Sequence, residues 1–188
     1  MATQPVQGLT YDDLEAFPED NFRREIIDGE LIVTAAPSTR HQRVVLELGA
    51  ALLAYTKEHG GEVYVAPTDV YFSHTNVVEP DVIFVRAEHG ERVEVKFIRS
   101  APDVVVEVSS PSTRRLELTR KWELYQRFGV PEYWSVDLDA DRVEIHRLQE
   151  GSYGRPVMLA GKDVLRSVEI PGFAIGIAQL LGLEADRP

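Results

Sequence analysis

The sequence feature that most constrains the fold is a pair of apolar, mostly β-branched runs, each bordered by an acidic residue. One run covers residues 82–85 and follows Asp81, and the other covers residues 104–108 and contains Glu107. Short, continuous runs rich in Val and Ile are typical of strands that are buried on both faces. The sequence therefore predicts a central sheet with carboxylates at the ends of two of its strands.

Helix and turn signals predict the elements around these strands. Ser38 is a suitable N-cap for a helix over residues 38–59, which an apolar stripe supports and Gly60 ends. The dipeptide Asp28-Gly29 is typical of the two-residue turn of a β-hairpin over residues 23–33. A second helix is expected from about residue 112 to residue 128, and a short strand is expected over residues 93–97.

The C-terminal third alternates between apolar and polar residues. This pattern predicts a hairpin from residues 133–137 and 142–147, further strands over 153–159 and 164–170, and a short helix over 177–183. No repeat or linker interrupts the chain. The prediction is one α/β domain over residues 1–188, with a core from about residue 10 to residue 182.

Composition excludes several classes of function. The chain has no cysteine, which rules out disulfides and thiolate metal sites, and no apolar run is long enough to span a bilayer. The N-terminus lacks the features of a signal peptide, so we expect a cytoplasmic protein with no membrane partner. The net charge of −11 argues against a broad nucleic-acid-binding face. Basic residues do cluster locally at Arg114-Arg115 and Arg120-Lys121.

The two strand acids and a following lysine suggest a metal site. If the strands pair with the relevant ends together, Asp81 and Glu107 can share one ion, and the Val108 carbonyl offers a further oxygen. Mg²⁺ prefers such oxygen ligands, and beside a phosphate it stabilises the developing charge. Lys121, on the next predicted helix, can add positive charge and help to orient or deprotonate a water molecule.

The same residues also have ordinary structural interpretations. Asp81 follows Pro80 and could be a turn residue. Acids at strand ends are also common in any acidic chain. Lys121 lies four residues after Glu117, the spacing of a salt bridge on a helix. His41, on the apolar face of the first long helix, is typical of a hydrogen-bonded histidine at the rim of a core. Spacing alone leaves these alternatives open.

Several strings nevertheless occur together in one nuclease family. They are Arg24-Glu25-Ile26-Ile27-Asp28-Gly29-Glu30-Leu31, Glu79-Pro80-Asp81, Glu107-Val108-Ser109-Ser110-Pro111-Ser112-Thr113, Lys121, and Gly129-Val130-Pro131-Glu132-Tyr133-Trp134. From Tyr11 to about Leu180 the chain resembles the Uma-type family of "putative restriction endonucleases", within the PD-(D/E)XK superfamily. The resemblance implies a restriction-endonuclease-like α/β fold, with a mixed central sheet flanked by helices and additional N-terminal and C-terminal β-hairpins.

The resemblance also implies roles for individual residues. Asp81 corresponds to the first metal ligand and Glu107 to the second, and Glu25 matches an N-terminal acid that some relatives add to the site. The superfamily's lysine normally lies two residues after the second acid, where this chain has Ser109. Lys121 is then the relocated substitute. The implied cofactor is Mg²⁺, with Mn²⁺ as an alternative.

Three functional classes follow. The leading hypothesis is a metal-dependent endonuclease that hydrolyses DNA phosphodiester bonds, and the two-fold symmetry of duplex cleavage suggests a homodimer. The alternative is a catalytically inactive nuclease-fold module that acts through protein interactions, which the overall acidity and Ser109 favour. A hydrolase acting on another phosphoester is the third class.

Overall fold

The computed structural model describes residues 8–18, 20, 22–34, 36–109 and 117–183. The helical elements are α1 (Tyr11–Glu15), α2 (Thr39–His59), η1 (Ala87–Arg92), η2 (Glu117–Lys121), α4 (Trp122–Phe128) and α5 (Ile177–Leu181). The strands are β1 (Arg23–Ile27), β2 (Glu30–Thr34), β3 (Glu62–Val65), β4 (Asp69–Ser73), β5 (Asn76–Val78), β6 (Val82–Val85), β7 (Phe97–Arg99), β8 (Val104–Ser109), β9 (Glu132–Asp137), β10 (Arg142–Gln149), β11 (Ser152–Tyr153), β12 (Val157–Ala160), β13 (Val164–Arg166) and β14 (Ala174–Gly176).

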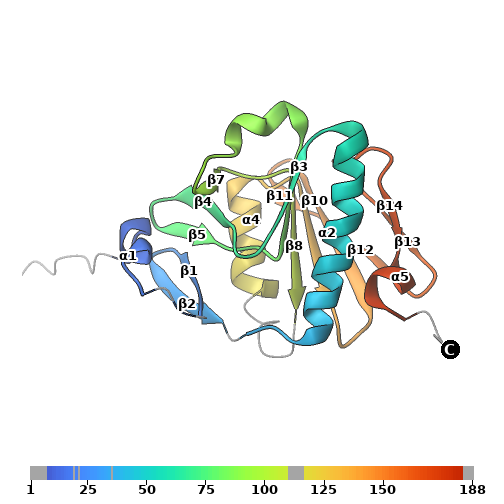
Figure 1. Cartoon of the computed structure of the whole chain (residues 1–188), viewed down its shortest axis with the longest axis horizontal. Coiled ribbons are helices and arrows are strands. Elements are labelled where there is room, and N and C mark those ends of the chain that lie inside the picture. The colour runs from blue at the N-terminus through green and yellow to red at the C-terminus, as the bar shows by residue number, and fades with distance from the viewer. Residues whose placement is uncertain (1–7, 19, 21, 35, 110–116, 184–188) are drawn as a thin grey trace, which may run out of the picture.

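A central mixed sheet organises the molecule (Figure 1). Its strand order is β11-β10-β9-β8-β6-β3, and β12 also pairs with β10. Strands β8 and β9 run parallel, whereas β8 and β6 run antiparallel. A second sheet, of order β2-β1-β5-β4-β7, lies beside the first and carries the N-terminal hairpin, while β13 and β14 form a two-stranded sheet near the C-terminus. The predicted mixed α/β architecture is confirmed.

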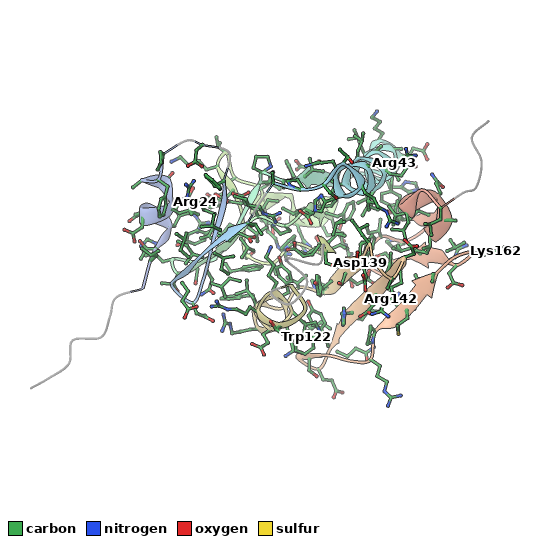
Figure 2. The ribbon with its side chains drawn as sticks, turned by 90° about the horizontal axis from the view of Figure 1, so that it is seen from below. Arg24, Arg43, Trp122, Asp139, Arg142 and Lys162 are labelled. Carbon is green, nitrogen blue, oxygen red and sulfur yellow. The ribbon has the colours of Figure 1, made fainter. Side chains whose placement is uncertain are left out.

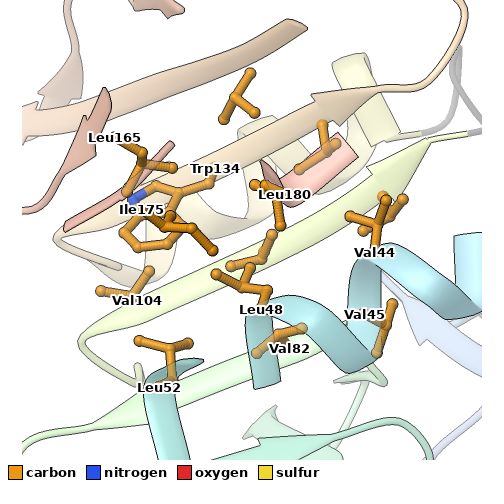
Figure 3. Close-up of a cluster of buried hydrophobic side chains, with 14 of the residues drawn as sticks. Val44, Val45, Leu48, Leu52, Val82, Val104, Trp134, Leu165, Ile175 and Leu180 are labelled. Atoms are coloured by element: carbon orange, nitrogen blue, oxygen red, sulfur yellow. The ribbon is translucent and has the colours of Figure 1, made fainter. Parts of the chain in front are cut away.

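Helix α2 covers one face of the central sheet. Val44, Leu48 and Leu52 recur at helical spacing and are almost fully buried. They pack in one cluster with the side chains of β6, β8 and β9, as Figure 3 shows for Val82, Val104 and Trp134. The C-terminal elements close this core with Leu165, Ile175 and Leu180.

Helix α4 covers the opposite face. Figure 2 shows α2, labelled at Arg43, and α4, labelled at Trp122, on opposite sides of the molecule. Successive side chains of a strand point to opposite faces, so Val105 and Glu107 of β8 face α4 while their even-numbered neighbours face α2. The geometry of β8 thus directs one carboxylate into the layer between the sheet and α4.

Local signals identified the N-terminal hairpin and the long helix correctly. Asp28 and Gly29 have φ values of 53° and 78°, as the predicted two-residue turn requires. Ser38 caps α2 by accepting a hydrogen bond from the backbone N–H of His41, and Gly60 follows the last turn.

Three predicted strands are wrong in extent. The strand expected over residues 153–159 is divided into β11 and β12, and residues 154–156 belong to neither. Residues 93–97 do not form a strand; Val93 makes a single bridge to Ile98, and the strand of this region is β7. Val95 is fully exposed, so the alternation in this segment does not mark a buried face. The strand expected over residues 164–170 ends at Arg166, because the backbone N–H groups after it bind side chains instead of a neighbouring strand.

The start of the second predicted helix, near residue 112, lies outside the described residues. The described part begins with one π-helical turn, Glu117–Lys121, and continues as α4. Gly129 ends the helix in the left-handed conformation, with φ of 80°. Across the described residues, we find no helix with the length and apolar character needed to traverse a lipid bilayer.

Candidate active site

The pairing of β6 with β8 brings the two strand acids to the same end of the sheet. Val82 lies opposite Val106 in the antiparallel ladder, so Asp81, one residue before β6, lies beside Glu107. The backbone N–H of Val108 donates a hydrogen bond of 2.7 Å to Oδ2 of Asp81. Asp81 and Glu107 are 2% and 0% exposed. Both carboxylates are therefore held in the interior, a placement that is rare for acids without partners.

Lys121 connects Glu107 with Glu25. Its Nζ lies 2.9 Å from Oε1 of Glu107 and 2.7 Å from Oε1 of Glu25, and the lysine is itself 2% exposed. The Tyr125 hydroxyl, one turn further along the helix, donates a second hydrogen bond to Oε1 of Glu107. Glu25 Oε1 also accepts a hydrogen bond of 2.8 Å from the backbone N–H of Glu79. Glu25 from β1 and Glu107 from β8 thus both contact the ammonium group that Lys121 of the π-helical turn supplies.

Asp81 has its own set of partners. Oδ1 accepts a hydrogen bond of 2.8 Å from Nη1 of Arg23, and Oδ2 lies 3.1 Å from Nε2 of His41. Strand β1 supplies Arg23, and the first turn of α2 supplies His41. The two halves of the site are joined by the guanidinium of Arg23, whose Nη2 lies 3.8 Å from Oε2 of Glu107 and 3.6 Å from Oε1 of Glu25.

These contacts shift the proton affinities of the cluster. Burial opposes ionisation of Asp81, but the hydrogen bond from His41 and the charge of Arg23 outweigh it and lower the pKa of Asp81 to about 2. Burial raises the pKa of Glu107, and Lys121 opposes part of that rise. Burial disfavours the ammonium of Lys121, but the charges of Glu107 and Glu25 outweigh it and raise the lysine pKa. At neutral pH the site therefore combines an ionised Asp81 with a protonated Lys121.

A divalent ion of the kind that the fold implies fits these donors in part. Oε2 of Glu107 and Oε2 of Glu25 are buried and have no hydrogen-bond partner among the described residues. Free, buried carboxylate oxygens are what a hard cation such as Mg²⁺ takes as ligands, together with waters. The described residues contain no group of three or more His, Cys, Asp or Glu side chains arranged around a common metal position. Were an ion to bind here, these two buried carboxylate oxygens would be available to it, and waters would complete its coordination.

The four predicted side chains come together, and those of Arg23, His41 and Tyr125 join them. Asp81, Glu107, Lys121 and Glu25 form one continuous network. Val108 presents its N–H to Asp81, and a metal-binding role for its carbonyl stays a prediction. Ser109, at the usual lysine position, donates its hydroxyl proton to the backbone carbonyl of Val136 instead.

Sequence reasoning missed Arg23 and Tyr125 and assigned His41 no part in the site. Arg23 lies two residues before Glu25, so the two side chains share one face of β1, which is the available sequence signal. His41 is buried and hydrogen-bonded, as its ordinary interpretation predicted, yet its partner is Asp81. Only the tertiary contact shows that connection.

A cavity of about 550 Å³ adjoins the cluster. Arg23, His41, Glu79 and Asp81 line it, and so do apolar residues of α1. Burial is the main cause that raises the pKa of Glu79 to about 7. Arg23 retains 22% exposure of its side chain, whereas Glu107 and Lys121 are buried and do not line the cavity. Arg23 therefore lines the cavity and also contacts the buried acids Glu25 and Glu107.

Comparisons with known proteins identify the fold and the family of the chain. A crystal structure of a "putative nuclease" from Anabaena variabilis superposes with a TM-score of 0.77 at 20% sequence identity, covering 93% of this chain and 98% of that one. At this identity the likeness establishes a shared nuclease-like fold. No curated protein matches the chain. The Uma2 family model, described as "Putative restriction endonuclease", matches residues 10–178, and the chain therefore belongs to the Uma2 family.

Proposed function

We propose that the protein is a divalent-metal-dependent endonuclease that hydrolyses DNA phosphodiester bonds. In this proposal Asp81 and Glu107 hold Mg²⁺, or Mn²⁺ in its place, and the carbonyl of Val108 is a third ligand. Lys121 acts on the water or the scissile phosphate, and Glu25 is an auxiliary acid. Family membership and the nuclease-like fold support the nuclease class.

One observation carries the proposal. The Lys121 ammonium lies 2.9 Å from Glu107, whose other carboxylate oxygen is buried without a hydrogen-bond partner among the described residues. An acid with one oxygen held by an ammonium at hydrogen-bond distance, and the other only 3.8 Å from a guanidinium, can receive a second cation at that other oxygen. Ion pairs that serve only stability usually satisfy both oxygens, because an unpaired buried oxygen costs about 1–3 kcal/mol.

The chain's own groups suit this chemistry. When bound, Mg²⁺ would stabilise charge on the phosphoryl oxygens and lower the pKa of a water molecule. Lys121 keeps its proton beside two carboxylates, which favours orienting water or phosphate over removing a proton. Glu25 forms a second ion pair with Lys121, and the Tyr125 hydroxyl donates a hydrogen bond to Glu107. His41 and Val108 fix Asp81 in one orientation.

The decisive experiment compares isosteric variants. Asp81→Asn and Glu107→Gln should each lower Mg²⁺-dependent cleavage of plasmid DNA by at least about 100-fold, an effect comparable to removing one electrostatic stabiliser. Glu132→Gln is the matched control, because Glu132 is equally buried but its partners are Trp134, Arg147 and Ser167. At a temperature where all variants are folded, the control should cleave like the wild type. Equal cleavage by all four proteins would refute the assignment.

The catalytically inactive module remains the alternative because the acids are already paired with Arg23 and Lys121. Calorimetric titration with Mg²⁺ or Mn²⁺ distinguishes the two functions. Binding heat that disappears in Glu107→Gln supports the nuclease, and no heat at millimolar metal together with no cleavage supports the inactive module.

The homodimer also belongs to the proposal. A net charge of −11 weakens the attraction of one subunit to DNA, and two copies provide two active sites for the two strands of a duplex. Light scattering coupled to size exclusion at micromolar concentration should give twice the chain mass of 21.1 kDa. A mass of one chain, with and without a DNA duplex, would contradict the dimer.

A further inference from the structure

The Arg23 guanidinium lies in the space between the two acids proposed to hold the ion. Its Nη1 is 2.8 Å from Oδ1 of Asp81, and its Nη2 is 3.8 Å from Oε2 of Glu107. Mg²⁺ binds carboxylate oxygens at about 2.1 Å, so an ion shared by these two atoms would overlap the guanidinium. Arg23 and the ion therefore cannot hold these positions together.

The guanidinium is attached at only one corner. Its Nη1 donates the hydrogen bond to Asp81, whereas Nε and Nη2 are buried and lack hydrogen-bond partners among the described residues. Its remaining carboxylate contacts, to Glu25, Glu79 and Glu107, are 3.6 Å or longer. An arginine has five N–H donors in a fixed fork, so a purely structural arginine at this position would be expected to satisfy more of them.

Arg23 also has room to move. It lines the cavity of about 550 Å³ that reaches Asp81, and 22% of its side chain is exposed there. Glu107 and Lys121 lie behind it and do not line the cavity. A cation that enters the cavity meets the guanidinium beside Asp81.

We propose that Arg23 is a displaceable gate of the metal site, which bridges Asp81 and Glu107 until a divalent ion takes its place and moves it into the adjoining cavity. This inference rests on the proposed function, since it requires that the acids bind a metal. Arg23 is a positioning residue in the metal-free state and limits the apparent affinity for the ion, because binding must break its ion pairs.

Titration calorimetry with MnCl₂ tests the competition. Arg23→Ala should bind Mn²⁺ at least tenfold more tightly than the wild type. Arg24→Ala is the matched control: Arg24 is the next residue on the same strand, carries the same charge and lines the same cavity, but its carboxylate partner is Asp20. Its affinity should stay within about twofold of the wild type, which measures the general effect of removing one charge. Arg23→Gln serves as a second variant if Arg23→Ala fails to fold.

The outcomes separate this inference from the proposed function. If the wild type binds Mn²⁺ and neither Arg23 variant binds it more tightly, the gate is wrong and the metal site stands. If neither the wild type nor the Arg23 variants bind Mn²⁺, the gate and the proposed metal site are both wrong. If Arg24→Ala gains as much affinity as Arg23→Ala, the effect is general electrostatics and the gate is wrong.

Chemical modification tests the displacement itself. Phenylglyoxal reacts with accessible guanidinium groups, and peptide mass spectrometry reports the extent at each arginine. Saturating Mn²⁺ should raise the modification rate of Arg23 in the wild-type protein several-fold and leave that of Arg24 unchanged. An unchanged or slower rate at Arg23 under saturating Mn²⁺ would overturn the displacement.

Discussion

The Nζ of Lys121 lies 2.9 Å from Oε1 of Glu107, in a pair that is almost completely removed from water. A buried ion pair is weak evidence for stability, because desolvation of both charges offsets their attraction. Here the ammonium also contacts Glu25, and the acid also accepts a hydrogen bond from Tyr125. Such a network fixes the orientation of each member, which is what an active site requires of its supporting groups.

Loss of the ammonium should destabilise the chain strongly. Lys121→Met keeps the length of the side chain but removes the cation nearest to the buried acids Glu25 and Glu107, so the free energy of unfolding should fall by about 3–5 kcal/mol. Urea denaturation at pH 7 measures the change. Lys57→Met, at an exposed position of α2, should change it by less than about 0.5 kcal/mol. A similar small loss in both variants would contradict the role assigned to Lys121.

Two tyrosines allow a matched test of hydrogen-bond strength. Both hydroxyls donate in the interior, Tyr125 to the Glu107 carboxyl group and Tyr153 to the neutral backbone carbonyl of Val130. Tyr125→Phe should cost about 1.5–3 kcal/mol of unfolding free energy, and Tyr153→Phe about 0.5–1.5 kcal/mol. Chemical denaturation of both variants provides the measurement. The reverse order would indicate that the Tyr125 hydroxyl does not bind a charged group.

Glu132 connects the C-terminal segment to the central sheet. Its fully buried carboxylate accepts hydrogen bonds from Trp134, Arg147, Ser167 and the backbone N–H of Val168. Glu132→Ala leaves these donors unpaired, so the unfolding free energy should fall by about 3–5 kcal/mol. Amide hydrogen exchange should also accelerate most around residues 164–170. Uniform acceleration over the whole chain would show that Glu132 does not act locally.

Asp69 should make stability depend on pH. Burial is the main cause that raises its pKa to about 6, so the folded chain keeps a proton that the unfolded chain loses near pH 4. Between these pH values the folded state binds more protons, and its stability therefore falls as pH rises. Asp69→Asn should be about 1–2 kcal/mol more stable than wild type above pH 6, a value reduced for partial exposure.

The advantage of Asp69→Asn should vanish below about pH 4, where the wild-type carboxyl is protonated in both states. Thermal unfolding from pH 3 to pH 8 provides the measurement. Asp139→Asn, at an exposed turn position labelled in Figure 2, controls for the change in net charge. A constant difference between Asp69→Asn and wild type across this range would contradict the prediction.

Much of the fold was predictable because its signals are local. Asp28-Gly29 sets the N-terminal turn, Ser38 and Gly60 bound α2, and Gly129 ends α4. The strand predicted around Val95 was wrong, because the alternation of apolar and polar residues there does not correspond to a buried face. The predicted end of the strand that begins at residue 164 was wrong, because hydrogen bonds to the side chains of Ser167 and Glu132 replace pairing with a neighbouring strand. The contact between Ser167 and Glu132 joins residues 35 positions apart in the sequence.

The candidate site also has features that the sequence predicts and features that only the structure shows. The apolar runs beside Asp81 and Glu107, and the strings shared with the Uma2 family, are properties of the sequence alone. The prediction that the two acids lie together depended on the condition that their strands pair with these ends adjacent, and the structure meets that condition. The sequence left open whether Lys121 joins the site or forms a helix salt bridge with Glu117, and the structure places its ammonium against Glu107.

The sequence by itself determined the strands, the long helix, the family and the identity of the acids, because propensity, capping and alternation act between near neighbours. Only the tertiary structure decided that Arg23 lies between Asp81 and Glu107, that His41 binds Asp81, and that Lys121 meets Glu25. These groups come from two sheets and two helices. Charges separated by many residues meet only when packing of the sheets and helices brings their side chains into one dry volume, where each charge needs a partner.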